Sequence, residues 1–78
     1  MTDTERRLIR CVRAVFPELQ SDDETLRASE SSVAAWDSLG TVVLAAAVEE
    51  EFEIEVNPEH LERLRSFDSY VRLLGDAR

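Results

Sequence analysis

The sequence is poor in the side chains that build disulfides and metal sites, because it contains one cysteine and one histidine. A lone Cys11 cannot form an internal disulfide, which fits a protein of the reducing cytoplasm. We expect Cys11 to be a buried structural thiol. With so few nitrogen and sulfur ligands a zinc site is not expected, and no residue is assigned to a metal.

Long apolar runs are also missing. No segment approaches the roughly 18 consecutive apolar residues of a membrane helix, and the first residues lack the charged and then apolar pattern of a signal peptide. We therefore expect a cytoplasmic protein without a membrane span. The hydrophobic content of 44% is ordinary for a globular chain, and residues 1–78 are expected to form a single small domain.

Positive charge is scarce in the middle of the chain, and the formal net charge is −8. Between residues 17 and 62 thirteen acidic residues stand against one arginine, Arg27, whereas both ends carry a small positive charge. Nucleic-acid binding is disfavoured, because no clustered basic face is available to displace counterions. The acidic middle instead favours a basic protein partner.

Hydrophobic periodicity predicts a first helix over residues 4–16, with Thr4 as its cap and Pro17 as its end. Apolar residues recur at helical spacing on one side of it, namely Leu8, Val12, Val15 and Phe16. Arg6, Arg10 and Arg13 take the solvent side. Residues 18–36 are predicted to be a long loop with a helical turn, pinned by Leu19, Leu26 and Val33. A connection of this length is typical of a functional loop.

A second helix is predicted over residues 38–52. Asp37 suits the N-cap position, because its carboxylate can accept from backbone N–H groups left free at a helix start. Ser38 then lies on the first turn, near the positive end of the helix dipole. A phosphate ester on its hydroxyl would be favoured there, although the local pattern also fits an ordinary first-turn serine.

Two apolar stripes run along this predicted helix. The first is expected to face the core and comprises Thr41, Leu44, Ala45, Val48 and Phe52. The second comprises Leu39, Val42, Val43 and Ala46. Either both stripes are buried in a central helix, or the second stays partly exposed beside Ser38 as a docking surface.

Five glutamates crowd the end of the same helix and the residues after it: Glu49, Glu50, Glu51, Glu53 and Glu55. The helix dipole is negative there, and each like-charge pair four residues apart costs about 0.2–0.5 kcal/mol. Local stability is therefore not the reason for the cluster. We interpret it as a recognition surface for arginine and lysine side chains, and we expect added salt to raise the melting temperature.

The last third of the chain predicts two more helices. Asn57, Pro58 and Glu59 form a typical helix start for a short helix over residues 58–64, with Leu61 and Leu64 inward. Ser66 is the expected cap of a final helix over residues 67–74, which Gly75 ends. Ile54 and Val56 are expected to turn inward before these helices, and the final helix should bury Phe67, Tyr70 or Val71, and Leu74. The predicted fold is all-α, a small four-helix bundle of three main helices and one short helix.

Residues 36–56, WDSLGTVVLAAAVEEEFEIEV, resemble the attachment-site segment of the acyl carrier proteins, which are phosphopantetheine-binding carriers. The likeness is to the discrete bacterial type, without a gap here and more loosely over about residues 4–74. It implies a right-handed helical bundle with a 4′-phosphopantetheine arm on Ser38. A separate phosphopantetheinyl transferase would donate the arm from coenzyme A in a magnesium-dependent reaction. The arm would hold acyl groups as thioesters, and the chain itself would be no enzyme and have no catalytic residue.

The same resemblance assigns the partner surface. Asp37 precedes the modified serine, and the partner-binding residues would be Leu39, Val42, Val43, Ala46, Glu49 and Glu50. Partners would be an acyl-loading ligase or transferase and a ketosynthase or other acyl-processing enzyme, with the carrier a monomer. Carriers of fatty-acid synthesis commonly have acids where this chain has Gly40 and Val43, and often Met in place of Ala46. The resemblance therefore favours a discrete carrier of a polyketide or other specialised pathway over housekeeping fatty-acid synthesis.

Three alternatives stay open on the sequence. The chain is similar enough to aminoacyl and peptidyl carriers to serve a nonribosomal-peptide-type pathway. An unmodified acidic helical adaptor would use the second helix without any arm on Ser38. A serine hydrolase would need His60 as its base, and it lacks the strand-turn-helix setting of such enzymes.

Overall fold

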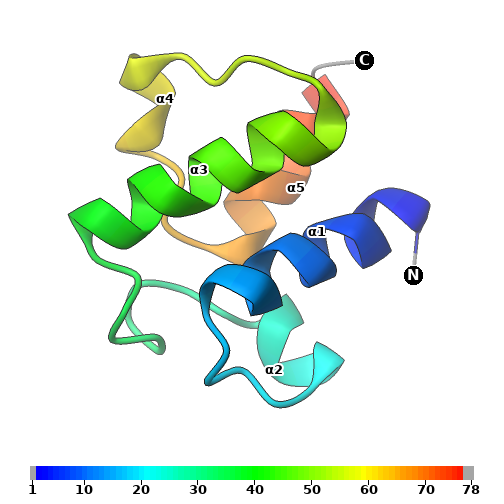
Figure 1. Cartoon of the computed structure of the whole chain (residues 1–78), viewed down its shortest axis with the longest axis vertical. Coiled ribbons are helices and arrows are strands. Elements are labelled where there is room, and N and C mark those ends of the chain that lie inside the picture. The colour runs from blue at the N-terminus through cyan, green and yellow to red at the C-terminus, as the bar shows by residue number, and fades with distance from the viewer. Residues whose placement is uncertain (1, 77–78) are drawn as a thin grey trace.

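A computed structural model describes residues 2–76 of the chain. Within that part five helices follow one another: α1 (Asp3–Val15), α2 (Asp22–Leu26), α3 (Ser38–Phe52), α4 (Pro58–Leu61) and α5 (Phe67–Asp76). The three long helices α1, α3 and α5 form the body of the molecule, with α2 packed on α1 and α5, and α4 packed on α3 (Figure 1). The described residues form no strand, so the all-α class is confirmed. The predicted count of four helices was wrong by one.

The additional helix is α2, which lies inside the stretch predicted to be a loop with one helical turn. Ser21 caps it, with the side-chain oxygen accepting from the backbone N–H of Glu24 at 3.1 Å. The acidic residues of its first turn also complement the helix dipole. These are ordinary helix-start signals in a segment only five residues long, where hydrophobic periodicity has no room to develop.

Helix α1 begins at Asp3, and its cap lies two residues before the predicted one. Thr2 is the N-cap, and its side chain accepts from the backbone N–H of Glu5 at 3.1 Å. The Glu5 carboxylate accepts in return from the Thr2 backbone N–H at 2.9 Å, which lowers the pKa of Glu5. The prediction of Thr4 was wrong, because a glutamate three residues after Thr2 completes a capping box, whereas Arg7 occupies that position relative to Thr4.

The last two helices also differ from their predicted ends. Helix α4 stops at Leu61 instead of residue 64, although Leu64 is buried as predicted. Helix α5 begins with a reciprocal pair of backbone–side-chain hydrogen bonds between Ser66 and Ser69, which supports the predicted cap. It continues through Gly75 to Asp76, and Gly75 has no positive φ, so its predicted role as a helix stop was wrong.

One short tertiary pairing ties the loop before α3 to the start of α5. Ser29 and Ser66 form an isolated antiparallel bridge. The backbone N–H of Glu30 donates to the carbonyl oxygen of Arg65, and that of Phe67 donates to the carbonyl oxygen of Ala28, both at 2.9 Å. This pairing brings the side chains of Glu30 and Arg65 to one place on the surface.

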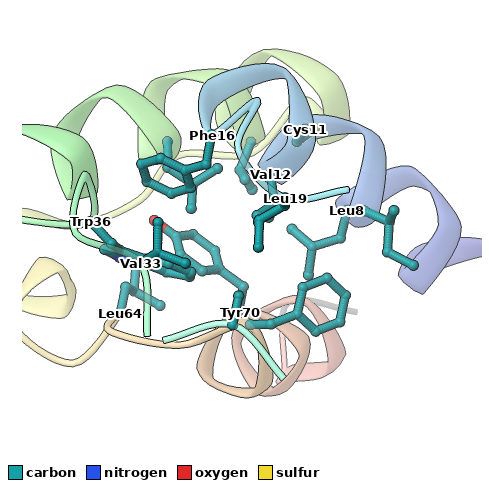
Figure 2. Packing of buried hydrophobic residues seen from close by; sticks show 14 of the residues in the cluster. Leu8, Cys11, Val12, Phe16, Leu19, Val33, Trp36, Leu64 and Tyr70 are labelled. Atoms are coloured by element: carbon teal, nitrogen blue, oxygen red, sulfur yellow. The ribbon is translucent and has the colours of Figure 1, made fainter. Parts of the chain in front are cut away.

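The core lies between the three long helices and the loop that precedes α3 (Figure 2). Phe16 and Trp36 stack with ring centroids 5.2 Å apart, and Tyr70 reaches toward them across the core, 6.3 Å from Trp36. Most residues predicted to point inward are buried: Leu8, Val12, Phe16, Leu19, Val33, Val56, Phe67, Tyr70 and Leu74. Val15, Leu26, Ile54, Leu61 and Val71 are partly buried at its edge. Cys11 is a buried free thiol as predicted, and burial raises its pKa.

None of the helices in residues 2–76 combines the length and the apolar character that a membrane crossing requires. Over the same residues, no group of histidine, cysteine, aspartate and glutamate side chains is arranged to hold a metal ion.

Candidate functional site

The site begins at the first turn of α3, whose bounds match the predicted 38–52. Asp37 is the N-cap as predicted: its backbone is extended, and its carboxylate accepts from the backbone N–H of Gly40 at 2.8 Å. Ser38 follows as the first helical residue and is exposed. Its hydroxyl is therefore accessible at the positive end of a 15-residue helix.

Gly40 is buried under the loop that leads into α3. A Cβ built on it would lie 2.1 Å from the carbonyl oxygen of Ala35 and 3.2 Å from the ring of Phe16. The loop thus rests directly on the first turn of the helix and leaves no room for a side chain. The sequence interpretation of Gly40 as a missing acid on the docking face is wrong, because Gly40 is buried in this fold.

The second apolar stripe of α3 is exposed. Leu39 keeps 72% of its surface in contact with solvent, Val42 keeps 52% and Val43 keeps 47%, and Ala46 is exposed as well. The first stripe contributes Leu44, Ala45 and Val48 to the core, while Thr41 and Phe52 are partly buried. Of the two readings left open by the sequence, the fully buried central helix is wrong. We call Leu39, Val42, Val43 and Ala46 the exposed stripe.

The glutamates at the end of α3 do not form one uniform surface. Glu49 is half-buried, and its carboxylate accepts from the backbone N–H of Val56 at 2.9 Å. Glu51 binds Arg7, whose Nε donates to the Glu51 carboxylate at 2.9 Å and whose Nη2 donates to its carbonyl oxygen at 2.6 Å. Glu49 and Glu51 are therefore engaged in hydrogen bonds within the fold.

The remaining acids of this cluster face solvent. Glu50 is exposed one turn beyond the exposed stripe, and Glu53 and Glu55 are exposed after it. Glu53 ends the helix in the left-handed conformation, with φ 55°. Of the two acids predicted to bind partners, Glu50 is thus open to the solvent, and Glu49 is committed to the backbone of Val56.

A groove of about 380 Å³ opens beside Ser38, between α3 and the segment that contains α4. Its lining comes from three parts of the chain: Glu30, Asp37, Ser38, Thr41, Val42, Leu61, Glu62 and Arg65. We call it the Ser38 groove. Arg65 is anchored at its rim, with Nη1 donating to the Glu30 carboxylate at 2.7 Å and Nε donating to the carbonyl oxygen of Glu62 at 2.6 Å.

Sequence reasoning missed Glu30, Glu62 and Arg65 as neighbours of Ser38. No local pattern signals their proximity, because the Ser29–Ser66 bridge and the packing of α4 on α3 create it. His60, the base that a hydrolase would need, lines a different depression together with Arg63 and Arg72. The lining of the Ser38 groove contains no histidine, so the geometry gives the hydrolase alternative no support.

Comparison with known proteins adds no assignment to this site. No protein-family model matches the chain, and no solved structure gives a significant match. The functional argument therefore depends on the residues and geometry of the chain itself.

Proposed function

We propose that this chain is a carrier protein of the acyl carrier type, with a 4′-phosphopantetheine arm on Ser38 that holds acyl groups as thioesters. It would deliver them to enzymes of a fatty-acid, polyketide or other specialised pathway. The single observation that carries the proposal is the pairing of an exposed serine at the start of α3 with an exposed apolar stripe on the same helix. A merely structural helix would gain stability by burying Leu39, Val42 and Val43.

The residues around Ser38 fit the proposed group. The hydroxyl is accessible to a modifying enzyme, and a phosphate on it would lie near the free backbone N–H groups of the first turn. The adjoining Ser38 groove offers apolar surface from Val42 and Leu61. When bound, the group would supply a thiol for the thioester, and the chain would contribute attachment, orientation and a surface for partners.

Partner recognition would use the exposed stripe with Glu50 at its end. Apolar contacts provide affinity, while the acidic neighbourhood steers basic partners and makes the association sensitive to salt. A small interface of this kind suits a protein that must bind a transferase, a loading enzyme and acyl-processing enzymes in turn, and release each of them. Tethering raises the local concentration of the cargo at every docked active site.

The unmodified adaptor is the rival that shares this surface, because the exposed stripe and Glu50 would recognise a basic partner without any arm. The two functions differ in one chemical event, the covalent change at Ser38. An experiment on that event therefore separates them.

The test is the intact mass of the purified protein after incubation with coenzyme A, Mg²⁺ and a broad-specificity phosphopantetheinyl transferase. We expect the mass to rise by one phosphopantetheine moiety in the wild type and in Ser31→Ala, a control at another exposed serine. Ser38→Ala should show no gain. No gain in the wild type would overturn the proposal, as would a gain that persists in Ser38→Ala, and the adaptor would then be the better account.

A further inference from the structure

Ser38, to which the proposed arm is attached, lines the Ser38 groove, so the first atoms of the arm would lie beside this groove. Its apolar part consists of Val42 and Leu61, with Thr41 beside them. Its charged lining consists of Glu30, Asp37, Glu62 and Arg65. Among the described residues, Arg65 is therefore the single cation in this lining, beside three carboxylates.

Arg65 is held in place and yet keeps hydrogen-bond capacity. Two of its nitrogens are engaged, Nη1 by the Glu30 carboxylate and Nε by the carbonyl oxygen of Glu62. A guanidinium carries five N–H donors, and within residues 2–76 no hydrogen bond engages Nη2. The side chain keeps 57% of its surface exposed. The guanidinium is thus oriented before any ligand binds and can donate to a second anion.

The backbone around Arg65 restricts where that guanidinium can go. The carbonyl oxygen of Arg65 accepts from Glu30, and the next residue, Ser66, pairs with Ser29. The ion pair with Glu30 therefore spans two segments that are already joined through their backbones. Little conformational freedom is lost when such a side chain binds a ligand, which favours binding.

Charge decides which ligand suits this position. A phosphodiester on Ser38 would carry a negative charge into a groove that already contains three carboxylates, and their repulsion would push the arm outward. A guanidinium matches the geometry of phosphate oxygens and forms charge-assisted hydrogen bonds with them. In the part of the chain that the structure describes, Arg65 is the one cationic lining residue that can offset the repulsion.

We infer that Arg65 is a positioning residue for the arm: its guanidinium pairs with the phosphate on Ser38 and keeps the first part of the arm over Val42 and Leu61. The inference rests on the proposed function, because it requires the arm. In the unmodified protein Arg65 would remain on Glu30, and modification would draw part of its hydrogen bonding to the phosphate.

The phosphorus nucleus of the modified protein provides the test, since the unmodified chain contains no phosphorus. Wild type, Arg65→Gln, Arg65→Lys and Arg63→Gln are each converted to the modified form, and conversion is verified by intact mass. We expect the ³¹P resonance of Arg65→Gln to be shifted from that of the wild type. The ³¹P resonance of Arg65→Lys should lie between those of the wild type and Arg65→Gln. That of Arg63→Gln should match the wild type, because Arg63 lines another depression.

Ionic strength and the variant Glu30→Gln test whether Arg65 acts on the phosphate directly or only by maintaining the local structure. Raising the ionic strength from about 0.01 M to 1 M shortens the screening length from about 30 Å to 3 Å, so the ³¹P resonance of the wild type should move toward that of Arg65→Gln. Glu30→Gln breaks the ion pair without removing the guanidinium, so its ³¹P resonance should keep the response to salt that Arg65→Gln loses. A structural role through Glu30 would instead make Glu30→Gln resemble Arg65→Gln.

The failures of the two proposals are distinguishable. If the wild type gains no mass, the carrier function itself is wrong. If all variants are modified and Arg65→Gln has the same ³¹P resonance and salt response as the wild type and Arg63→Gln, the carrier function stands and the role of Arg65 is overturned.

Discussion

Gly40 lies directly under the carbonyl oxygen of Ala35, so closely that a Cβ on Gly40 would come within 2.1 Å of that oxygen. The contact joins the loop before α3 to the first turn of α3, next to Ser38. The atom in the way belongs to the backbone, which cannot rotate aside as a flexible side chain would. The position of the loop beside Ser38 thus depends on the absence of a side chain at Gly40.

Gly40→Ala should destabilise the protein by about 1–3 kcal/mol, because the added methyl group forces the loop away from the helix. The sign is informative, since replacing glycine by alanine inside a helix usually stabilises it. Gly75→Ala is the matched control: no atom of the described residues lies within 4 Å of its Cβ position, and we expect a gain of about 0.5–1 kcal/mol. Urea unfolding followed by circular dichroism measures both. A stabilised Gly40→Ala would contradict the close packing of the loop.

Glu53→Gly should stabilise the protein by about 1 kcal/mol, because Glu53 holds the left-handed conformation that costs a residue with a Cβ about 1–2 kcal/mol. Its φ of 55° is the one positive value among the non-glycine residues described. Glu53→Gln removes the same charge and keeps the strain, so it separates backbone from electrostatics in thermal unfolding. Equal gains from the two variants would assign the effect to charge alone.

Arg7→Gln should lower the free energy of unfolding by about 1 kcal/mol. It removes the hydrogen bonds to Glu51 and the cation–π contact of the guanidinium, which lies 4.5 Å from the centre of the Phe52 ring. The side chains of Arg7 and Glu51 keep 35% and 41% of their surface exposed, and solvent screening limits what their ion pair contributes to stability. The melting temperature of the wild type should rise with salt as glutamate repulsion is screened, and more steeply in Arg7→Gln. Arg6→Gln, an exposed neighbour, is the control, and identical salt slopes in the three proteins would refute this account.

Leu39→Ser tests whether the exposed stripe serves binding instead of stability. Leu39 is 72% exposed, so the free energy of unfolding should change by no more than about 0.5 kcal/mol. Modification by the transferase should slow by about tenfold, the equivalent of 1.4 kcal/mol of lost contact. Leu44→Ala, on the buried side of the same helix, should instead cost about 2–5 kcal/mol. A Leu39→Ser protein that is modified at the wild-type rate would remove Leu39 from the partner surface.

Tyr70→Phe should leave the protein as stable or raise its stability by about 1 kcal/mol at neutral pH, because the variant loses a buried hydroxyl that has no hydrogen-bond partner within residues 2–76. Burial, with a smaller effect from the charge of Glu49, also raises the pKa of Tyr70. The neutral phenol is thus favoured in the folded state, and stability should fall as the pH rises above the ordinary tyrosine pKa of about 10.

Unfolding of the wild type and Tyr70→Phe at neutral and alkaline pH measures both effects. The loss of stability at alkaline pH should be smaller in Tyr70→Phe. The loss that remains includes the contribution of Cys11, because burial also raises the pKa of its thiol. A large loss of stability in Tyr70→Phe at neutral pH would show that the hydroxyl has a partner.

The sequence by itself determined the elements whose signals are local. Asp37 followed by a run of helix-compatible residues defined α3 to the residue, because a cap and an apolar period are both encoded within a few neighbours. The same kind of signal failed where two candidates competed, as with Thr2 and Thr4, or where a helix was as short as α2. It also failed at Gly75, since a glycine ends a helix only where the backbone turns left-handed.

Tertiary structure alone decided what surrounds Ser38. Apolar residues occur all round α3, so periodicity could not tell which stripe faces the core. The packing of α1 and α4 on α3 leaves Leu39, Val42 and Val43 in solvent. The loop over Gly40 and the placement of Arg65 at the Ser38 groove arise from contacts between segments distant in the chain. Such contacts depend on how whole elements pack, and no short stretch of residues encodes them.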